Sequence, residues 1–231
     1  MPATPLFDVP PAPCVAIAGL DQVFPVRRVF CVGRNYAAHA AEMGNEVDRD
    51  APFYFTKSAH AVIPPGSEIA YPLGTKDCHY EMELVIAIGA EAHDVAEARA
   101  LDAVYGYACG IDLTRRDLQA KAKDGRKPWD LGKDFENSAL MGAITPAAEF
   151  GEVGRRAITL DLDGQRVQEA RLSDMIWSVP EIIAHLSRFY HLAPGDLIYT
   201  GTPAGVGPVV PGSVLNGAIE GLEPITLTIV K

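Results

Sequence analysis

The chain has few cysteines and no long apolar run, and these absences argue against several classes of protein. Its 231 residues include four cysteines, with no C-x-x-C spacing and no histidines at zinc-ligand spacing, so neither a zinc site nor a disulfide framework is expected. No apolar stretch approaches the roughly 20 residues that span a bilayer. The N-terminal sequence M-P-A-T-P-L-F-D lacks the basic and apolar regions of a signal peptide. We therefore expect a cytoplasmic protein with no membrane partner.

Basic charge is also scarce. Thirty acidic residues against 20 basic ones give a formal net charge of -10, which argues against nucleic acid as a partner. One stretch reverses this balance, because seven basic and only three acidic side chains lie between Arg115 and Lys133. This basic stretch either attracts a small anion or forms the solvated face of a helix.

The distribution of turn residues predicts a β-rich α+β fold. Eighteen prolines and 21 glycines separate many short apolar runs, and the length fits one domain. Asp163-Gly164 carries the signal of a tight hairpin turn. We predict strands near Val29–Val32, Phe53–Thr56, Glu81–Ile88, Val104–Leu113, Ala157–Leu162, Asp196–Tyr199, Ser213–Ile219 and Ile225–Val230.

Only a few helices are expected. We predict one capped by Asn35 that stops at Gly44, one capped by Asp94 over Val95–Leu101, one from about Arg115 to Lys123, and one after Ser178. The last is the clearest, because Ser178 and Glu181 fit a capping box. Its apolar residues Ile182, Leu186 and Phe189 recur at helical spacing and are expected to pack on the sheet. The polar residues 42–52 between the first helix and the next strand form a candidate mobile loop.

Three carboxylates form the strongest candidate site. Glu81 and Glu83, in H-Y-E-M-E-L-V-I, are two apart on a predicted strand and therefore project to the same face. Asp112 ends a second apolar strand. Buried carboxylates repel each other and lose hydration, and a hard divalent cation compensates for both costs. An all-oxygen set favours Mg²⁺, Mn²⁺ or Ca²⁺ over zinc. The alternative is a solvated strand face with no ion.

A histidine and a glutamate near the first helix are a candidate general base. His39 and Glu42 lie three apart, so they are neighbours on the helix surface. A carboxylate bonded to one imidazole nitrogen fixes the tautomer and raises the basicity of the other nitrogen. The preceding G-R-N-Y places Arg34 beside the helix N-terminus, an arrangement suited to an anion. An ordinary surface ion pair is the competing interpretation.

Two further segments have open roles. T-G-T-P-A-G-V-G-P-V offers backbone N–H groups and threonine hydroxyls to an oxyanion or carboxylate, or is simply a tight turn. Lys133, in P-W-D-L-G-K-D-F, either neutralises charge at a metal site or lies on the surface with its stem over Trp129.

Six motifs, in this order, resemble the fumarylacetoacetate hydrolase family. They are V-G-R-N-Y-A-A-H-A-A-E-M-G, F-Y-F-T-K-S-A-H-A-V-I, H-Y-E-M-E-L-V-I-A-I-G, G-I-D-L-T-R-R-D-L-Q-A, P-W-D-L-G-K-D-F and T-G-T-P-A-G-V-G-P-V. The resemblance covers roughly residues 27 to 230. It implies a mixed-sheet β-roll or sandwich of that family's C-terminal-domain type with a few short helices, residues 1–26 as an N-terminal extension with short strands, and residues 27–231 as the catalytic domain.

The resemblance also implies the chemistry and the residues. One divalent cation per subunit of a homodimer, Mg²⁺ or Mn²⁺ with Ca²⁺ possible, would be held by Glu81, Glu83 and Asp112. His39 and Glu42 would activate water, and their segment would act as a lid that orders on substrate. Lys133, Gln119, Arg34 and Thr202 would contact a small anionic keto-acid substrate or the developing enolate. Two departures from the family pattern, at Lys57 and at Asp134, leave the roles of these residues open.

The expected reaction is hydrolysis of a C–C bond in a 2,4-diketo acid, with 3-fumarylpyruvate of the gentisate pathway of aromatic catabolism as the expected substrate. Three alternatives stay open. An acylpyruvate hydrolase differs only in the acyl group that it accepts. An oxaloacetate decarboxylase or keto–enol isomerase uses the same site without an attacking water. A non-catalytic metal-binding module is the most distant alternative.

Overall fold

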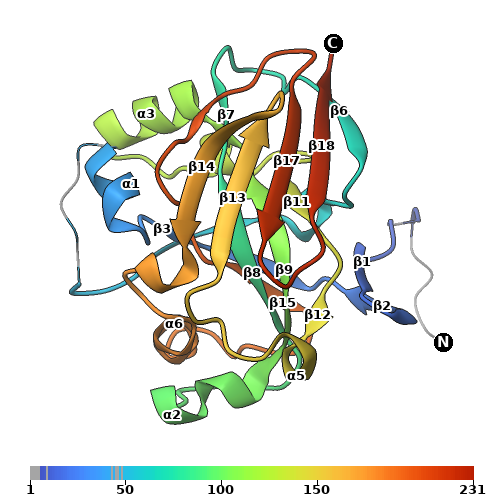
Figure 1. Cartoon of the computed structure of the whole chain (residues 1–231), viewed down its shortest axis with the longest axis vertical. Helices are drawn as coiled ribbons and strands as arrows, with labels where there is room; N and C mark the ends of the chain where they lie inside the picture. Colours follow the sequence, from blue (N-terminus) through green and yellow to red (C-terminus); the bar gives the residue numbers. More distant parts are fainter. Residues whose placement is uncertain (1–5, 9, 43, 45–46, 48) are drawn as a thin grey trace.

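The computed structural model describes residues 6–8, 10–42, 44, 47 and 49–231. Its centre is an eight-stranded mixed sheet (Figure 1). In spatial order the strands are β4 (Phe53–Lys57), β3 (Arg28–Gly33), β15 (Asp196–Tyr199), β8 (Met82–Ile88), β9 (Val104–Asp112), β11 (Ala139–Met141) and β5 (Val62–Ile63), with β12 (Thr145–Pro146) also paired to β9. The β15–β3 and β11–β5 pairs are parallel and the other pairs antiparallel.

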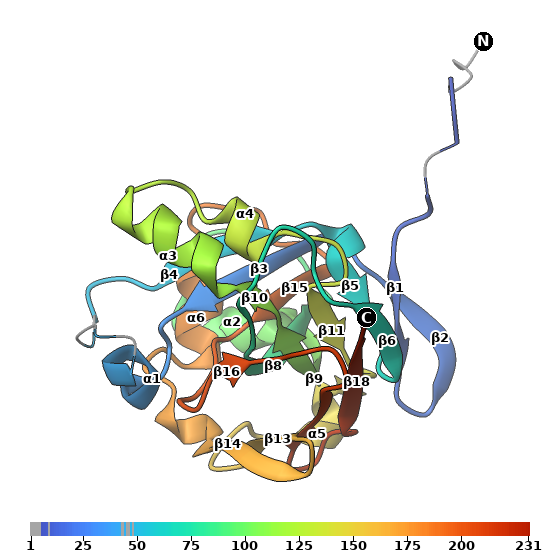
Figure 2. The same cartoon turned by 90° about the horizontal axis from the view of Figure 1, so that it is seen from above.

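Three smaller sheets surround this one. A five-stranded sheet has the order β14 (Gln165–Arg171), β13 (Ala157–Leu162), β17 (Val214–Ile219), β18 (Ile225–Val230) and β6 (Ser67–Ala70). A three-stranded sheet joins β10 (Thr114–Arg115), β7 (Cys78–Tyr80) and β16 (Gly207–Pro208), and a hairpin joins β1 (Cys14–Ile17) to β2 (Leu20–Pro25). The β1–β2 hairpin lies on the opposite side of the molecule from α1 and α3 (Figure 2).

The helices are short. They are α1 (Ala37–Glu42), α2 (Glu97–Ala100), α3 (Arg116–Asp124), α4 (Asp130–Lys133), α5 (Ala147–Phe150) and α6 (Val179–Leu186), with 3₁₀ turns at Ala59–Ala61, Leu101–Ala103 and Leu172–Asp174. In the part of the chain that the structure describes, no helix has the length and apolar character to cross a bilayer. The fold is thus the expected strand-rich mixed α+β architecture.

The central strand β8 is buried on both faces, and its side chains divide between two cores. Met82, Leu84 and Ile86 belong to the larger core, together with Leu160 of the five-stranded sheet. Val85 and Ala87 belong to a second core on the opposite face, together with residues of the β1–β2 hairpin. This alternation is the period of two that a strand imposes. Glu83 has the parity of Val85, so its carboxylate projects to that second face.

Most predicted strands are confirmed. The structure gives the predicted bounds for Ala157–Leu162, Asp196–Tyr199 and Ile225–Val230. The hairpin turn is also confirmed, with φ of 52° at Asp163 and 80° at Gly164. The other predicted bounds differ from the structure by one residue, and one of these differences concerns the site, because β8 begins at Met82 and Glu81 lies between β7 and β8.

The helix predictions are partly wrong. The helix from about Arg115 is confirmed, and Ser178 and Glu181 form the predicted capping box. Asn35 does not cap α1, because its side chain bonds to Trp177 and Thr200 instead. Asp94 does not cap α2, which begins at Glu97 with Ala96 as its N-cap.

Two expectations at segment ends have different outcomes. Phe189 was expected on the sheet but is 67% exposed, since α6 ends at Leu186. The candidate mobile loop at 42–52 includes residues 43, 45–46 and 48, so that prediction falls partly outside the described residues.

Candidate metal centre and active-site pocket

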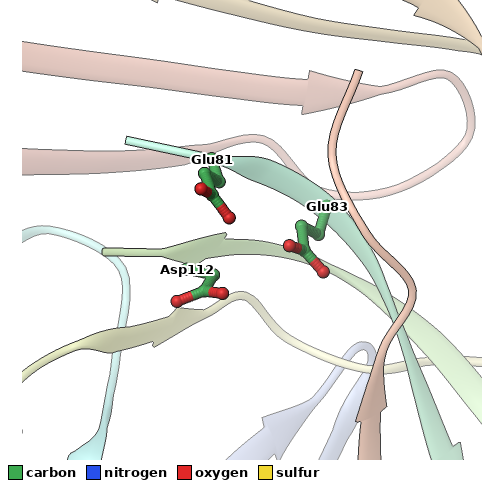
Figure 3. A group of neighbouring side chains, drawn as sticks. All are labelled: Glu81, Glu83 and Asp112. Atoms are coloured by element: carbon green, nitrogen blue, oxygen red, sulfur yellow. The ribbon is translucent and has the colours of Figure 1, made fainter. Parts of the chain in front are cut away.

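Three carboxylates converge at the ends of β8 and β9 (Figure 3). Glu81 lies just before β8, Glu83 is its second residue, and Asp112 is the last residue of β9. Their candidate ligand atoms all lie within 4.8 Å of one another, and the three residues are at most 5% exposed. The antiparallel register brings them together, since the Asp112 N–H donates to the Glu81 carbonyl at 2.9 Å. The predicted grouping is therefore present and buried.

Lys133 points into this cluster. Its Nζ donates to Glu81 Oε2 at 2.8 Å, to Asp112 Oδ2 at 2.7 Å and to Thr114 Oγ1 at 2.6 Å. The residue is 2% exposed, so the surface alternative for Lys133 is wrong. Its position comes from α4, which packs against α3 and β4.

Two further buried cations contact the carboxylates; the sequence left the role of Lys57 open and assigned no role to Arg116. Lys57 Nζ lies 2.8 Å from Asp112 Oδ1 and donates to the Leu113 carbonyl at 3.1 Å. Arg116 donates from Nη2 to Glu81 and from Nη1 to Gln119 Oε1, the latter at 2.7 Å. Two sequence features could have pointed to them. Lys57 ends the aromatic run F-Y-F-T-K, and Arg116 lies near the start of the basic stretch.

The electrostatics differ between the two glutamates. Burial alone raises the pKa of Glu81, but the charges of Lys133 and Arg116 outweigh it, so that pKa is lowered. Burial, reinforced by the Asp112 and Glu81 carboxylates, raises the pKa of Glu83 well above its ordinary value. Burial lowers the pKa of Lys133, but Asp112 and Glu81 reverse the effect and raise it. Glu83 is thus the carboxylate that most lacks a compensating positive charge.

The donor set fits a hard divalent cation. All three residues offer carboxylate oxygen, the ligand type that Mg²⁺, Mn²⁺ and Ca²⁺ prefer. Among the described residues, Asp112 Oδ1 forms an ion pair with Lys57 but accepts no hydrogen bond, and Glu83 accepts a single hydrogen bond, from the Gly201 N–H at 2.7 Å. These oxygens retain lone pairs for a metal, which also supplies the charge that Glu83 lacks.

The histidine pair is formed as the sequence predicts. His39 Nδ1 lies 3.0 Å from Glu42 Oε2, and the histidine is 6% exposed. The other carboxylate oxygen of Glu42 accepts the Gly205 N–H at 3.0 Å, so Glu42 is held from two sides. Because Nδ1 faces a carboxylate, Nε2 is the nitrogen that can accept a proton.

The glycine-rich segment supports the carboxylates. Gly201 has φ of 93°, and a Cβ there would lie 2.8 Å from Cβ of Asn35, so only glycine fits. Its N–H binds Glu83 and that of Gly205 binds Glu42, so these two groups hold protein carboxylates. Thr202 Oγ1 accepts a bond from Gln168 Nε2 at 2.9 Å. Gln168, a buried residue of β14 absent from the sequence prediction, therefore positions Thr202.

Seven of the nine predicted site residues line one pocket, whereas Glu42 and Asp112 lie behind His39 and Lys133, which they contact. The pocket is lined by Arg34, His39, Glu81, Glu83, Gln119, Lys133 and Thr202, and also by Val32, Gly33, Phe55, Arg116, Lys123, Trp129 and Gly201. Asp134 does not enter it, because its carboxylate accepts the Ser58 N–H at 2.7 Å. Of the two departures from the family pattern, Asp134 therefore caps the neighbouring turn at Ser58, whereas Lys57 forms an ion pair with Asp112.

A strand-rich mixed fold with three buried carboxylates and a histidine–glutamate pair defines the class as a candidate divalent-metal enzyme. Residues 28–230 match the family described as fumarylacetoacetate (FAA) hydrolase C-terminal. The chain therefore belongs to the fumarylacetoacetate hydrolase family.

Within this family, the chain is similar to fumarylpyruvate hydrolases and, at lower identity, to oxaloacetate tautomerases. The chain is 49% identical over 189 residues to a fumarylpyruvate hydrolase of a Ralstonia species, covering 81% of this chain and 98% of that one. A crystal structure of fumarylpyruvate hydrolase from Pseudomonas aeruginosa in complex with Mn²⁺ and pyruvate is 48% identical, with a TM-score of 0.95 over 98% of this chain and 99% of that one. The mitochondrial oxaloacetate tautomerase of Homo sapiens is 38% identical over 205 residues, covering 89% and 92% of the two chains.

Proposed function

We propose that this protein is a divalent-metal-dependent hydrolase that cleaves the C–C bond of 3-fumarylpyruvate to give fumarate and pyruvate. The observation that carries the proposal is the buried cluster of Glu81, Glu83 and Asp112 beside a paired His39 and Glu42. Similarity over nearly the whole chain to fumarylpyruvate hydrolases supports this substrate.

Glu81, Glu83 and Asp112 are the proposed ligands of one Mg²⁺ or Mn²⁺ ion. The metal would supply Lewis-acid polarisation of the keto oxygen and hold the reacting end of the substrate in place. Lys133 contacts two of these carboxylates, so its ammonium lies where it can stabilise negative charge that develops on the pyruvate half.

His39 is the proposed general base. Glu42 orients the ring through Nδ1, and Nε2 takes a proton from water as the water oxygen attacks the C4 carbonyl. Collapse of the tetrahedral adduct breaks the C3–C4 bond and leaves the electron pair on the pyruvate enolate. Protonation of C3 then completes pyruvate, and the other half leaves as fumarate. Arg34, Gln119 and Thr202 line the same pocket and are the proposed substrate-binding residues.

Oxaloacetate tautomerisation or decarboxylation is the second candidate, because relatives with that activity are 38% identical over most of the chain. These reactions stabilise an enolate but need no attacking water. The intact His39–Glu42 pair favours hydrolysis.

We further propose a homodimer, a cytoplasmic location and a role in gentisate catabolism, with residues 27–231 as the catalytic domain and residues 1–26 as an extension. These proposals are supported by the family membership and by the substrate proposed above. Light scattering after size exclusion tests the dimer, and a monomer at working concentration contradicts it.

The deciding experiment follows the ultraviolet absorbance of fumarylpyruvate with purified protein and Mg²⁺ or Mn²⁺, and then with EDTA. Oxaloacetate and acetylpyruvate are run in parallel, and pyruvate is quantified in each reaction. Release of pyruvate and fumarate that stops with EDTA supports the proposal. Inert fumarylpyruvate with tautomerised or decarboxylated oxaloacetate overturns it in favour of the second candidate.

A further inference from the structure

The pocket contains more positive charge than its carboxylates require. Glu81 and Asp112 contact three buried cations, which are Lys57, Arg116 and Lys133. These cations already match the three carboxylates in number. A divalent metal at the carboxylates therefore leaves the pocket positive before any other side chain is counted.

Two more cations line the pocket and have no carboxylate partner among the described residues. Arg34 and Lys123 both belong to the pocket lining, and neither forms an ion pair within 4.0 Å. Their contacts are instead aromatic, with the Arg34 guanidinium carbon 5.9 Å from the centre of the Phe53 ring.

Lys123 is held by its surroundings. It lies in the last turn of α3, and its Nζ is 5.1 Å from the centre of the Trp129 ring. Burial, followed by the charges of Arg116 and Arg34, lowers its pKa to about 8. Lys123 therefore lines the same pocket as Arg34 and contacts an aromatic ring.

Arg34 is placed by an unusual backbone conformation. Its φ is 59°, in the left-handed region that costs a non-glycine residue on the order of 1 kcal/mol. The strained residue directly follows β3, whose neighbour β15 leads into the glycine-rich segment. Strain of this kind is characteristic of binding sites.

We propose that Lys123, with Arg34, binds the second carboxylate of a dicarboxylic keto acid, and so selects dianionic over monoanionic substrates. Lys123 is the new member of the pocket. This inference rests on the proposed function and specifies which end of the substrate the two cations recognise. A carboxylate placed between them gains charge-assisted hydrogen bonds and offsets the excess positive charge of the loaded pocket.

The test compares two substrates that differ at that end. Fumarylpyruvate carries the second carboxylate, and acetylpyruvate has a methyl group there. We expect Lys123→Met to lower kcat/KM for fumarylpyruvate roughly tenfold or more, the size expected for loss of a hydrogen bond to a charged group. The value for acetylpyruvate should stay within about twofold of the parent enzyme.

A matched control and a second readout keep the result specific. Lys121→Met removes an exposed lysine of the same helix that does not line the pocket, and it should leave both substrates unchanged. Lys123→Arg should restore most of the preference. In calorimetric titrations of the metal-loaded protein, Lys123→Met should weaken binding of fumarate but not of oxalate, which engages the metal end.

The outcomes separate this inference from the proposed function. Equal losses on the two substrates, or equal weakening of fumarate and oxalate, overturn the assignment of Lys123 to the second carboxylate while hydrolysis itself stands. A parent enzyme that hydrolyses neither substrate overturns the proposed function, and fumarate binding by Lys123 is then still decided by the titrations.

Discussion

The carboxylate end of the pocket and its cationic end are built in opposite ways. At the carboxylate end, Glu81 and Asp112 are buried and each contacts two cations. At the cationic end, Arg34 and Lys123 contact aromatic rings and have no carboxylate partner among the described residues. At the first end, cations of the protein pair with Glu81 and Asp112, and a metal is left to compensate Glu83. The comparison teaches that the carboxylate end is held together largely by charges of the protein, whereas the cations of the second end are the candidates for binding an anion from outside.

The largest effect is expected from a change to a proposed metal ligand. We expect Glu83→Gln to reduce metal-dependent turnover on the order of a thousandfold or more, because one ligand charge is lost. The fold should persist, since an amide oxygen can still accept the Gly201 N–H and repulsion among the carboxylates falls. Turnover, bound metal and the melting temperature are measured together, with exposed Glu68→Gln as the control. A fully active variant would remove Glu83 from the ligand set.

The second prediction concerns the general base. His39→Ala should lower kcat roughly 10²- to 10⁴-fold, the usual range for a positioned base, and should weaken oxalate binding far less. Steady-state kinetics and oxalate titrations measure the two effects, and His60→Ala provides an exposed-histidine control. Equal losses in both measurements make His39 a binding residue instead.

The third prediction tests how much the buried cations at the carboxylate end stabilise the folded protein. Lys57→Met leaves Asp112 without one of its two ion-pair partners. Breaking a buried pair costs about 3–5 kcal/mol, which urea unfolding in the presence of EDTA measures directly. Lys76→Met, at an exposed position, should change stability by less than about 0.5 kcal/mol. A small effect of Lys57→Met would show that Lys133 alone compensates Asp112.

The fourth prediction concerns how pH changes the preference between the two substrates through the charge of Lys123. The pKa of Lys123 is about 8, set by burial and then by Arg116 and Arg34, with Glu81 opposing them and Lys133 adding to them. Raising the pH through 8 removes the Lys123 charge, so kcat/KM for fumarylpyruvate should fall relative to that for acetylpyruvate. The ratio of the two pH profiles measures this effect. Lys123→Arg should flatten the ratio, because arginine stays protonated.

The site residues that could be predicted are those whose partners, or whose strand or helix, lie nearby in the sequence. Glu81, Glu83 and Asp112 were found because a spacing of two beside one apolar run predicts a shared face, even though Glu81 itself precedes β8, and because a second apolar strand ends at Asp112. His39 and Glu42 were found from helical spacing. Lys57 was left without a role and Arg116 was missed, since nothing in their local sequence distinguishes a buried ion pair from a solvated charge. Their partners are 35 residues or more away along the chain.

The fold shows the same division. Capping of α6 by Ser178 was predictable because both partners lie within one turn. Asn35 was misassigned because its side chain donates hydrogen bonds to the carbonyls of Trp177 and Thr200, far away along the chain. Local sequence cannot reveal these partners, because only the folded chain brings them together. Phe189 fitted the helical pattern, but the helix ends first, so the side chain stays exposed.

The sequence by itself determined the strand-rich class, the carboxylate cluster and the histidine–glutamate pair, because turn residues, the ends of apolar runs and spacings of two and three residues are all local signals. Only the tertiary structure decided which charges of the basic stretch turn inward. Arg116 and Lys133 pair with the carboxylates, Lys123 enters the pocket unpaired, and Lys121 stays outside. That sorting follows from the packing of α3 and α4, which buries Arg116 and Lys133 beside opposite charges and leaves Lys123 half-buried against Trp129, because a fully buried charge without a partner is costly.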